Sequence, residues 1–410
     1  MDWSFLIEGK QAMSVTTDSR KVTPGCIFVA LKGEHFDGNE FVDQARQDGA
    51  AYIISGENAL AQLQDLARAW RRELGLPILA ITGTNGKTTT KELCAAVLKT
   101  KYNLYYTQGN LNNQLGVPLT LLQITRAHEM AIVEMGASHP GDIKELVEIA
   151  EPDYGLITNV GRAHLQGFGS FEGVQRTKAE LYDYLLAHNA TIFRNADNPY
   201  LAQMLESSRS RDHEITRSRI IEYHTGNMLE GTHLVGSYNA ENIQAALCVG
   251  DYFGVSRENA LDAIRAYVPS NNRSQLLQTD HNTVVVDAYN ANPTSMQAAI
   301  EAFSNSSKNG LTGEAGLTSN SEAVYLLGAM RELGEYSHLE HQNIVNMLLE
   351  RKADQVLLVG PEYKDTTAPY PVFDNVEELC EYLKKQPIRG ARILLKGSRS
   401  NTLEKVIPLL

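Results

Sequence analysis

The apolar positions of this 410-residue chain form short β-branched and aliphatic runs, which alternate with longer stretches of helical spacing. In the middle of the chain, AIVEMGA (131–137), YGLITNV (154–160) and ATIFRNA (190–196) predict strands. GDIKELVEIAE (141–151) and VQRTKAELYDYLLAHN (174–189), which lie between them, predict helices. This alternation is typical of a parallel, doubly wound α/β sheet. We expect such a sheet, mostly parallel, to form a central domain over residues 77–271.

Two further blocks flank this domain. In residues 1–76, CIFVALKG and AAYIISG predict strands and NEFVDQARQDGA predicts a helix between them, so we expect a small α/β domain. From residue 272 to residue 410 the alternation returns, with strand runs such as NTVVVDAY, AVYLLGAM and ARILLKG, and it predicts a C-terminal Rossmann-like domain. The pattern therefore predicts three α/β domains.

One segment departs from the alternation. Ser304 to Ser321 is rich in Ser, Asn and Gly and offers little apolar surface to bury. We predict a flexible surface connection that is dispensable for activity.

The stretch ILAITGTNGKTTTKEL (78–93) joins an apolar run to a Gly-rich turn and then to a helical pattern that begins at Lys87. A glycine turn before a helix presents backbone N–H groups that suit phosphate. Lys87 would reach the terminal phosphates of a nucleotide, and the Thr88 hydroxyl would bind Mg²⁺. The general G-x-x-x-x-G-K-[ST] pattern has Gly where this chain has Ile81, and an ordinary strand–helix turn is the alternative. The placement of Lys87 and Thr88 favours a nucleotide site made of Gly83, Thr84, Asn85, Gly86, Lys87, Thr88 and Thr89, which the family resemblance given below identifies as an ATP site.

Three further candidates follow the loop. Glu134 ends a strand run, where parallel sheets place their ligands, and its carboxylate can bind Mg²⁺; a helix cap is the alternative. His164 follows a strand in a Gly-flanked loop, although a lone histidine is more often structural than a ligand. Lys178 lies near the start of a predicted helix, and most lysines in such a position are simply solvated.

Charge and composition exclude several other classes. The net charge of −12 argues against a general nucleic-acid partner or an anionic membrane surface. The four cysteines are far apart and form no metal-binding spacing, which suits reduced thiols. The N-terminal residues lack a basic segment followed by an apolar core, and no apolar run is long enough to span a membrane. We expect a cytoplasmic protein, and a monomer.

The motifs TGTNGKTTT, EMGAS, NVGRAHL and TKAEL, in this order, resemble the Mur ligases, the ATP-dependent amino-acid ligases of peptidoglycan synthesis. TTDSRKVTPGCIFVALKGEHFDGNEF is similar to the UDP-binding N-terminal domain of that family. GNLNNQLGVPLTLL, VVDAYNANPTSM, GAMRELGEYSHLEH and LLKGSRS resemble the branch that joins D-alanyl-D-alanine to UDP-N-acetylmuramoyl-tripeptide. The third residue of the tripeptide, diaminopimelate or lysine, stays open.

The resemblance implies a mechanism in which ATP phosphorylates the terminal carboxylate of the UDP-linked peptide, and the dipeptide amine then displaces the phosphate. It implies two Mg²⁺ ions, the first held by Thr88 and Glu134 and the second with help from His164. It also implies that Lys178 carries a CO₂-derived carbamate and that Lys87 neutralises the transferring phosphoryl group. The catalytic set is then Lys87, Glu134, His164 and Lys178.

The same resemblance assigns the remaining positions. Asn242, Arg273 and Asp287 would contact ATP, and Ser19, Arg20, Lys32 and Gly33 would bind the uridine diphosphate. The substrate cleft would include Asn112, Asn113, Tyr289, Asn290 and Asn292, with Lys396 and Arg399 as partners for the dipeptide carboxylate.

Two departures from the family pattern are visible. Ala329 stands where the family usually has Asp, so no role is assigned there. The chain is also short between NADNPY and GSYN, so one or two strands of the central domain could be missing.

Three alternatives to this function stay open. A sister ligase of the MurE or folylpolyglutamate synthetase type would share the loop and the modified lysine, although the MurE motif Asp-Asn-Pro-Arg is not found late in the chain. A P-loop kinase or regulatory NTPase would turn over ATP without needing both a UDP-peptide and an amine. An inactive scaffold is the third possibility.

Overall fold

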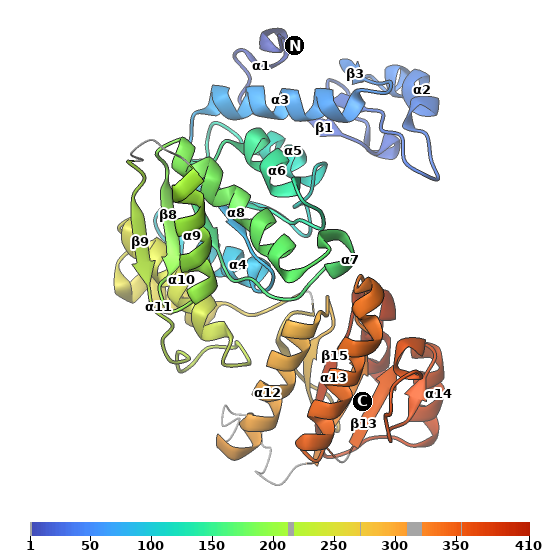
Figure 1. The fold of residues 1–410 in the computed structure, drawn as a ribbon. Coiled ribbons are helices and arrows are strands. Elements are labelled where there is room, and N and C mark those ends of the chain that lie inside the picture. Colours follow the sequence, from blue (N-terminus) through green and yellow to red (C-terminus); the bar gives the residue numbers. More distant parts are fainter. Residues whose placement is uncertain (1, 212–216, 271, 310–321, 354) are drawn as a thin grey trace.

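A computed structural model describes residues 2–211, 217–270, 272–309, 322–353 and 355–410. Within these ranges the strands form three sheets, one in each block that the sequence pattern separates (Figure 1). The three-domain α/β fold predicted from the sequence is therefore confirmed. The domain boundaries at residues 76/77 and 271/272 stay predictions.

The N-terminal block holds a small parallel sheet in the order β1-β2-β3. Its strands are β1 (Val15–Thr16), β2 (Ile27–Val29) and β3 (Tyr52–Ile54), and its short helices are α1 (Ser4–Ile7), η1 (Ser19–Lys21), η2 (Gly38–Phe41) and α2 (Val42–Gln47). The two predicted strands and the predicted helix are present, each shorter than its sequence run.

A long helix that the sequence analysis did not single out, α3 (Ala59–Leu74), joins this block to the central domain. Leu63, Leu66 and Trp70 on this helix are buried in a core that the first and central domains share. The Trp70 indole N–H donates a hydrogen bond to the backbone carbonyl of Ile124 at 2.9 Å. Helix α3 therefore fixes the small sheet to the central domain (Figure 1).

The central sheet is parallel throughout, in the order β5-β6-β4-β7-β8-β9. Its strands are β4 (Ile78–Thr82), β5 (Leu104–Tyr106), β6 (Met130–Glu134), β7 (Tyr154–Ile157), β8 (Thr191–Asn195) and β9 (Ile220–Tyr223). The helices are α4 (Lys87–Leu98), α5 (Gly116–Leu122), α6 (Asp142–Ala150), α7 (Leu165–Phe168), α8 (Phe171–Ala187), α9 (Pro199–Arg211), α10 (Asn239–Tyr252) and α11 (Arg257–Ala266). The predicted doubly wound sheet is confirmed.

Chain order reverses around β4 in this sheet, because β6 lies on one side of it and β7 on the other. Ligands of open α/β sheets bind at such a switch point, beyond the carboxyl ends of the strands. The Gly-rich loop follows β4, Glu134 ends β6, and the segment that leads to His164 follows β7. The topology therefore brings the three predicted segments to one edge.

The C-terminal sheet has the order β10-β11-β15-β12-β13-β14, in which β10 is antiparallel to β11 and the other pairs are parallel. Its strands are β10 (Gln275–Gln278), β11 (Thr283–Asp287), β12 (Glu322–Gly328), β13 (Gln355–Val359), β14 (Val372–Phe373) and β15 (Ala391–Lys396). Its helices are α12 (Pro293–Asn309), η3 (Gly334–Tyr336), α13 (Ser337–Glu350), η4 (Pro361–Tyr363), α14 (Val376–Lys385), η5 (Arg399–Asn401) and η6 (Leu403–Leu409).

The predicted flexible segment Ser304–Ser321 is wrong over its first six residues, because 304–309 continue helix α12. The Ser304 hydroxyl bonds the Ile300 carbonyl at 2.7 Å and lies 2.8 Å from the Tyr325 hydroxyl. Packing against β12 thus overrides the weak helix propensity of Ser and Asn. The rest of the segment lies outside the described residues.

None of the helices in the described ranges combines the length and the apolar character that a membrane crossing requires.

Candidate active site

A cavity of about 800 Å³ opens between the central and C-terminal domains. It gathers most of the residues predicted for ATP, metal and substrate. The predicted residues that line it are Thr84, Asn85, Gly86, Lys87, Thr88, Thr89, Asn112, Asn113, Glu134, His164, Asn242, Arg273, Asp287, Tyr289, Asn290, Asn292, Lys396 and Arg399.

Six predicted residues do not line this cavity. Gly83 is the first residue of the loop and packs against Thr158, and Lys178 is buried in α8. Ser19, Arg20, Lys32 and Gly33 belong to the N-terminal domain, across the central domain from the C-terminal sheet (Figure 1). There the exposed Arg20 pairs with Asp18 at 2.8 Å, and Lys32 lies 3.5 Å from Asp37.

Two glycines let the loop after β4 fold tightly. Gly83 has φ +142°, and a Cβ there would lie 2.0 Å from the Thr158 hydroxyl oxygen. Gly86 has φ +76°, and a Cβ there would lie 2.5 Å from Oδ1 of Asn242. Both positions therefore require a residue without a side chain.

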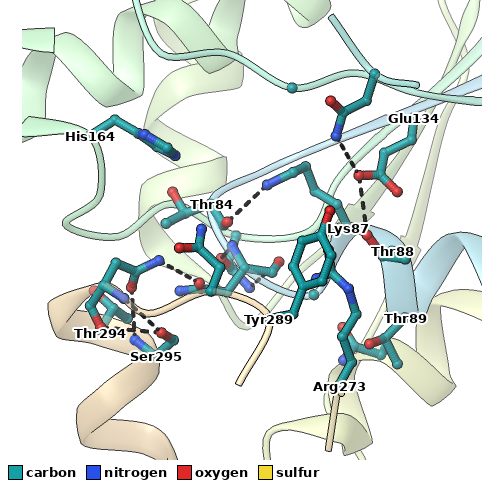
Figure 2. Close-up of a pocket in the computed structure, with 18 of the residues that line it drawn as sticks. Thr84, Lys87, Thr88, Thr89, Glu134, His164, Arg273, Tyr289, Thr294 and Ser295 are labelled. Atoms are coloured by element: carbon teal, nitrogen blue, oxygen red, sulfur yellow. Dashed lines mark hydrogen bonds between the residues drawn. The ribbon is translucent and has the colours of Figure 1, made fainter. Parts of the chain in front are cut away.

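Lys87 begins helix α4 and bends back over the loop (Figure 2). Its ammonium group donates to the carbonyls of Gly83 and Thr84 at 2.8 and 2.9 Å. Burial is the main cause that lowers the pKa of Lys87 to about 8; Glu134 opposes the shift, and the positive charge of Arg273 contributes to it. An anion in the loop would restore the charge of this ammonium group.

Glu134 and Thr88, the two predicted ligands of the first metal ion, are in contact. The Thr88 hydroxyl and the Asn112 amide donate to Oε1 of Glu134 at 3.2 and 2.8 Å (Figure 2). Within the described residues, Oε2 of Glu134 is buried without a hydrogen-bond partner. A buried carboxylate oxygen beside a hydroxyl is a donor set that suits a hard cation such as Mg²⁺.

Lys178 is 2% exposed, and its Nζ lies 5.8 Å from the centre of the Phe168 ring. Burial holds the pKa of Lys178 well below its usual range, and the charge of Lys87 adds to this effect. Asp142 and Glu180 act in the opposite direction. The site therefore favours the neutral amine.

His164 comes from the central domain and pairs through Nδ1 with Glu332 of the C-terminal domain. Burial lowers the pKa of His164, and the Glu332 carboxylate opposes the shift. Figure 2 shows the imidazole across the cavity from Glu134, on the far side of Lys87. Glu332 was not predicted as a site residue.

The C-terminal domain contributes a second set of charges. The Arg273 guanidinium lies against the Tyr289 ring (Figure 2), at 3.8 Å from the ring centre. The Lys396 ammonium is buried and donates to Asp287 at 2.5 Å. Arg399 is more exposed and bonds Glu404 at 2.8 Å. Of the two residues predicted for the dipeptide carboxylate, Arg399 is thus the more accessible.

Hydrogen bonds cross from the C-terminal domain directly to the phosphate loop and its neighbour. The Asn292 amide donates to Oδ1 of Asn85 at 2.8 Å, and the backbone N–H of Arg162 donates to the Thr294 hydroxyl at 3.0 Å. The Arg162 guanidinium also pairs with the buried Glu340 at 3.0 Å. The two domains therefore meet at the loop itself.

Sequence reasoning missed several residues that shape the loop. The Asn159 carboxamide accepts from the backbone N–H of Asn85 at 3.0 Å, and the Thr158 hydroxyl donates to the Asn85 carbonyl at 2.6 Å. Both residues directly follow β7, just before and at the start of the NVGRAHL motif. Their position at the end of a strand could have identified them as site residues from the sequence.

Comparison with known proteins gives consistent matches along the chain. Profiles of the "Mur ligase family, catalytic domain", the "Mur ligase middle domain" and the "Mur ligase, glutamate ligase domain" match residues 12–96, 81–250 and 272–399. The chain is 32% identical to a UDP-N-acetylmuramoyl-tripeptide–D-alanyl-D-alanine ligase of Bacillus subtilis, over 96% of this chain and 92% of the relative.

Two solved structures are similar over the same length. MurF from Acinetobacter baumannii has a TM-score of 0.83 at 28% identity, covering 96% of this chain and 92% of that one. MurF from Thermotoga maritima, in complex with ADP, has a TM-score of 0.82 at 27% identity, covering 97% of both chains. Together, the matched profiles, the full-length relative and the shared fold place this chain in the Mur ligase family.

Proposed function

We propose that this chain is an ATP-dependent ligase that joins D-alanyl-D-alanine to UDP-N-acetylmuramoyl-tripeptide, the MurF reaction of peptidoglycan synthesis. The observation that carries the proposal is the cavity between two domains, which combines a phosphate-binding loop with charged residues of the C-terminal sheet. The full-length relative from Bacillus subtilis is named as a ligase of this kind.

The chemistry explains why such a site needs ATP. An amine cannot displace oxide from a carboxylate, so the carboxylate first attacks the γ-phosphorus of ATP and forms an acyl phosphate with release of ADP. The dipeptide amine then attacks the acyl carbon, and the tetrahedral intermediate collapses with loss of inorganic phosphate. Lys87 would neutralise charge on the phosphoryl group during both steps.

Thr88 and Glu134 would hold one Mg²⁺ ion, and His164 would contribute to a second. Bound there, the metal would neutralise part of the charge on the nucleotide phosphates. Two observations support the first assignment: Thr88 contacts Glu134, and no described residue gives Oε2 of Glu134 a hydrogen bond. For His164 the support is its place in the cavity wall.

Lys178 would carry the CO₂-derived carbamate. Carbamate formation requires the neutral amine, and burial favours that form because it lowers the pKa of Lys178. The modification would turn a buried amine into a carboxylate-like group that could take part in metal binding.

The remaining roles, which concern ATP and substrate binding, are those that the family resemblance assigns. Arg273, Asp287 and Asn242 would contact ATP, and Arg399 would bind the dipeptide carboxylate through its planar fork of donors. Asn112, Asn113, Tyr289, Asn290 and Asn292 would line the substrate cleft. Ser19, Arg20, Lys32 and Gly33 would bind the uridine diphosphate in the N-terminal domain. We also propose that the protein is cytoplasmic, because its reaction consumes ATP, and that it is a monomer.

A phosphate-release assay tests the proposal against its rivals. The purified protein is given Mg·ATP and UDP-tripeptide, together with D-Ala-D-Ala or with the single amino acids used by sister ligases. We expect release that requires both the UDP-tripeptide and D-Ala-D-Ala. Release with a single amino acid would favour a sister ligase, and release that needs neither substrate would favour a simple NTPase.

A further inference from the structure

Helix α4 carries a second lysine, Lys91, that none of the proposed roles uses. Its side chain is 0% exposed, although lysine is rarely buried without a partner. Lys87 and Lys91 are four residues apart and so lie on the same face of the helix. Lys91 therefore lies one helical turn after Lys87, on the same side of α4.

The surroundings of Lys91 tie it to Glu134. Its Nζ donates to the carbonyl of Thr107 at 2.7 Å and lies 3.2 Å from the Glu92 carboxylate. It also lies 3.8 Å from Oε2 of Glu134, the oxygen that has no hydrogen-bond partner within the described residues. Thr107 completes the link, because its hydroxyl accepts from the backbone N–H of Glu134 at 3.0 Å.

The charge balance explains why this lysine is buried. Glu134 is 1% exposed, and a buried carboxylate without a nearby cation is strongly destabilising. The Lys87 ammonium is bound to the loop carbonyls and is the group that would meet the phosphates. The Lys91 ammonium is held by Glu92 and Thr107, so it stays beside Glu134 when a ligand binds or dissociates. It is thus a permanent counter-charge.

We propose that Lys91 is a positioning residue that holds Glu134 in place as its fixed counter-ion and weakens metal binding until the nucleotide arrives. A cation bound to Glu134 must lie close to the Lys91 ammonium, and like charges repel. The phosphates of ATP supply the negative charge that overcomes this repulsion. Metal and nucleotide therefore bind cooperatively. The inference rests on the proposed metal role of Glu134.

The test measures Mn²⁺ binding to the full-length, nucleotide-free protein at constant pH, by the electron paramagnetic resonance signal of free Mn²⁺. In Lys91→Met, a neutral residue of similar length, we expect Mn²⁺ to bind about tenfold more tightly or better. Lys99→Met, which removes an exposed lysine at the end of the same helix, should match the parent.

Two outcomes separate this inference from the proposed function. If Glu134→Gln abolishes Mn²⁺ binding but Lys91→Met binds Mn²⁺ no more tightly than the parent, the role of Lys91 is overturned and the metal site stands. If Glu134→Gln binds Mn²⁺ as the parent does, the proposed metal site is wrong, and the proposed role of Lys91 is wrong as well.

A stability measurement decides the case in which Lys91→Met does not fold. The double variant Lys91→Met/Glu134→Gln removes both buried charges, so it should fold and melt at a higher temperature than Lys91→Met alone. A double variant that is as unstable as the single one, or more so, would contradict the pairing.

Discussion

Lys87 is the residue on which the proposed chemistry depends most. Replacing it with Ala removes the cation that would face the transferring phosphoryl group, while the fold loses only two hydrogen bonds to loop carbonyls. We expect a fall in kcat on the order of 10³-fold or more, with a far-UV circular dichroism spectrum like that of the parent. Near-normal turnover in this variant would contradict the assignment of the phosphate site.

Lys87 also predicts a pH dependence of nucleotide binding. Its pKa in the ligand-free protein is about 8, so the side chain is mostly neutral above that pH. Bound phosphates would raise the pKa again, so ATP binding should take up a proton above pH 8, and affinity should fall as the pH rises toward 10. Calorimetry with a non-hydrolysable analogue, in buffers of different ionisation enthalpy, measures this uptake. Equal proton uptake in Lys87→Met would assign it to another group.

Where a sequence motif defined the neighbourhood, the structure brings the predicted residues together, and the roles assigned to them stay predictions. Loop residues Thr84–Thr89 and Glu134 line one cavity, because strand ends of a parallel sheet meet at one edge. Lys91 and Glu332 were not predicted as site residues. A lysine in a helix and a glutamate in a turn look solvated in sequence, and only the packing of other elements against them makes them part of the site.

At the scale of elements, the tight turn between β4 and α4 is tested by paired glycine substitutions. Gly86→Ala would place a Cβ 2.5 Å from Oδ1 of Asn242, whereas Gly75→Ala, also at a positive φ, meets nothing within 4 Å. Both should lose about 1 kcal/mol of stability from backbone strain. Gly86→Ala alone should also weaken binding of an ATP analogue, by roughly tenfold or more since the loop must shift. Equal affinities in the two variants would show that the loop tolerates the shift.

Most elements followed from apolar periodicity, and the exceptions have physical causes. The end of α12 was predicted as loop because Ser and Asn favour non-helical backbone, but contacts of Ser304 with Ile300 and Tyr325 extend the helix. Helix α3 was not singled out, because its apolar face packs on another domain and gives no local clue to its partner.

At the scale of the whole molecule, the site is complete only when the domains meet. The buried Glu340 of the C-terminal domain pairs with Arg162 of the central domain, and Asn292 bonds the phosphate loop. We expect small-angle scattering to show a smaller radius of gyration when ATP analogue and UDP-tripeptide are both added. Exclusion of water from a hydrolysable acyl phosphate requires such closure.

Arg162→Met should reduce this compaction, because Glu340 would then be buried without its cation. Arg209→Met is a suitable control, since Arg209 pairs with Glu206 on the surface of the central domain. An unchanged radius of gyration in an active parent enzyme, with or without ligands, would exclude closure as part of the mechanism.

The central claim, that the cavity activates a carboxylate by phosphorylation before the amine attacks, is tested most directly by isotope transfer. UDP-tripeptide labelled with ¹⁸O in its terminal carboxylate is incubated with Mg·ATP, D-Ala-D-Ala and the enzyme. The released phosphate is then analysed by mass spectrometry. When the amine attacks the acyl phosphate, the departing phosphate takes one of the two carboxylate oxygens with it. Each released phosphate should therefore carry one ¹⁸O, and the amide product should retain the other. Phosphate without ¹⁸O, released alongside the ligated product, would contradict the account.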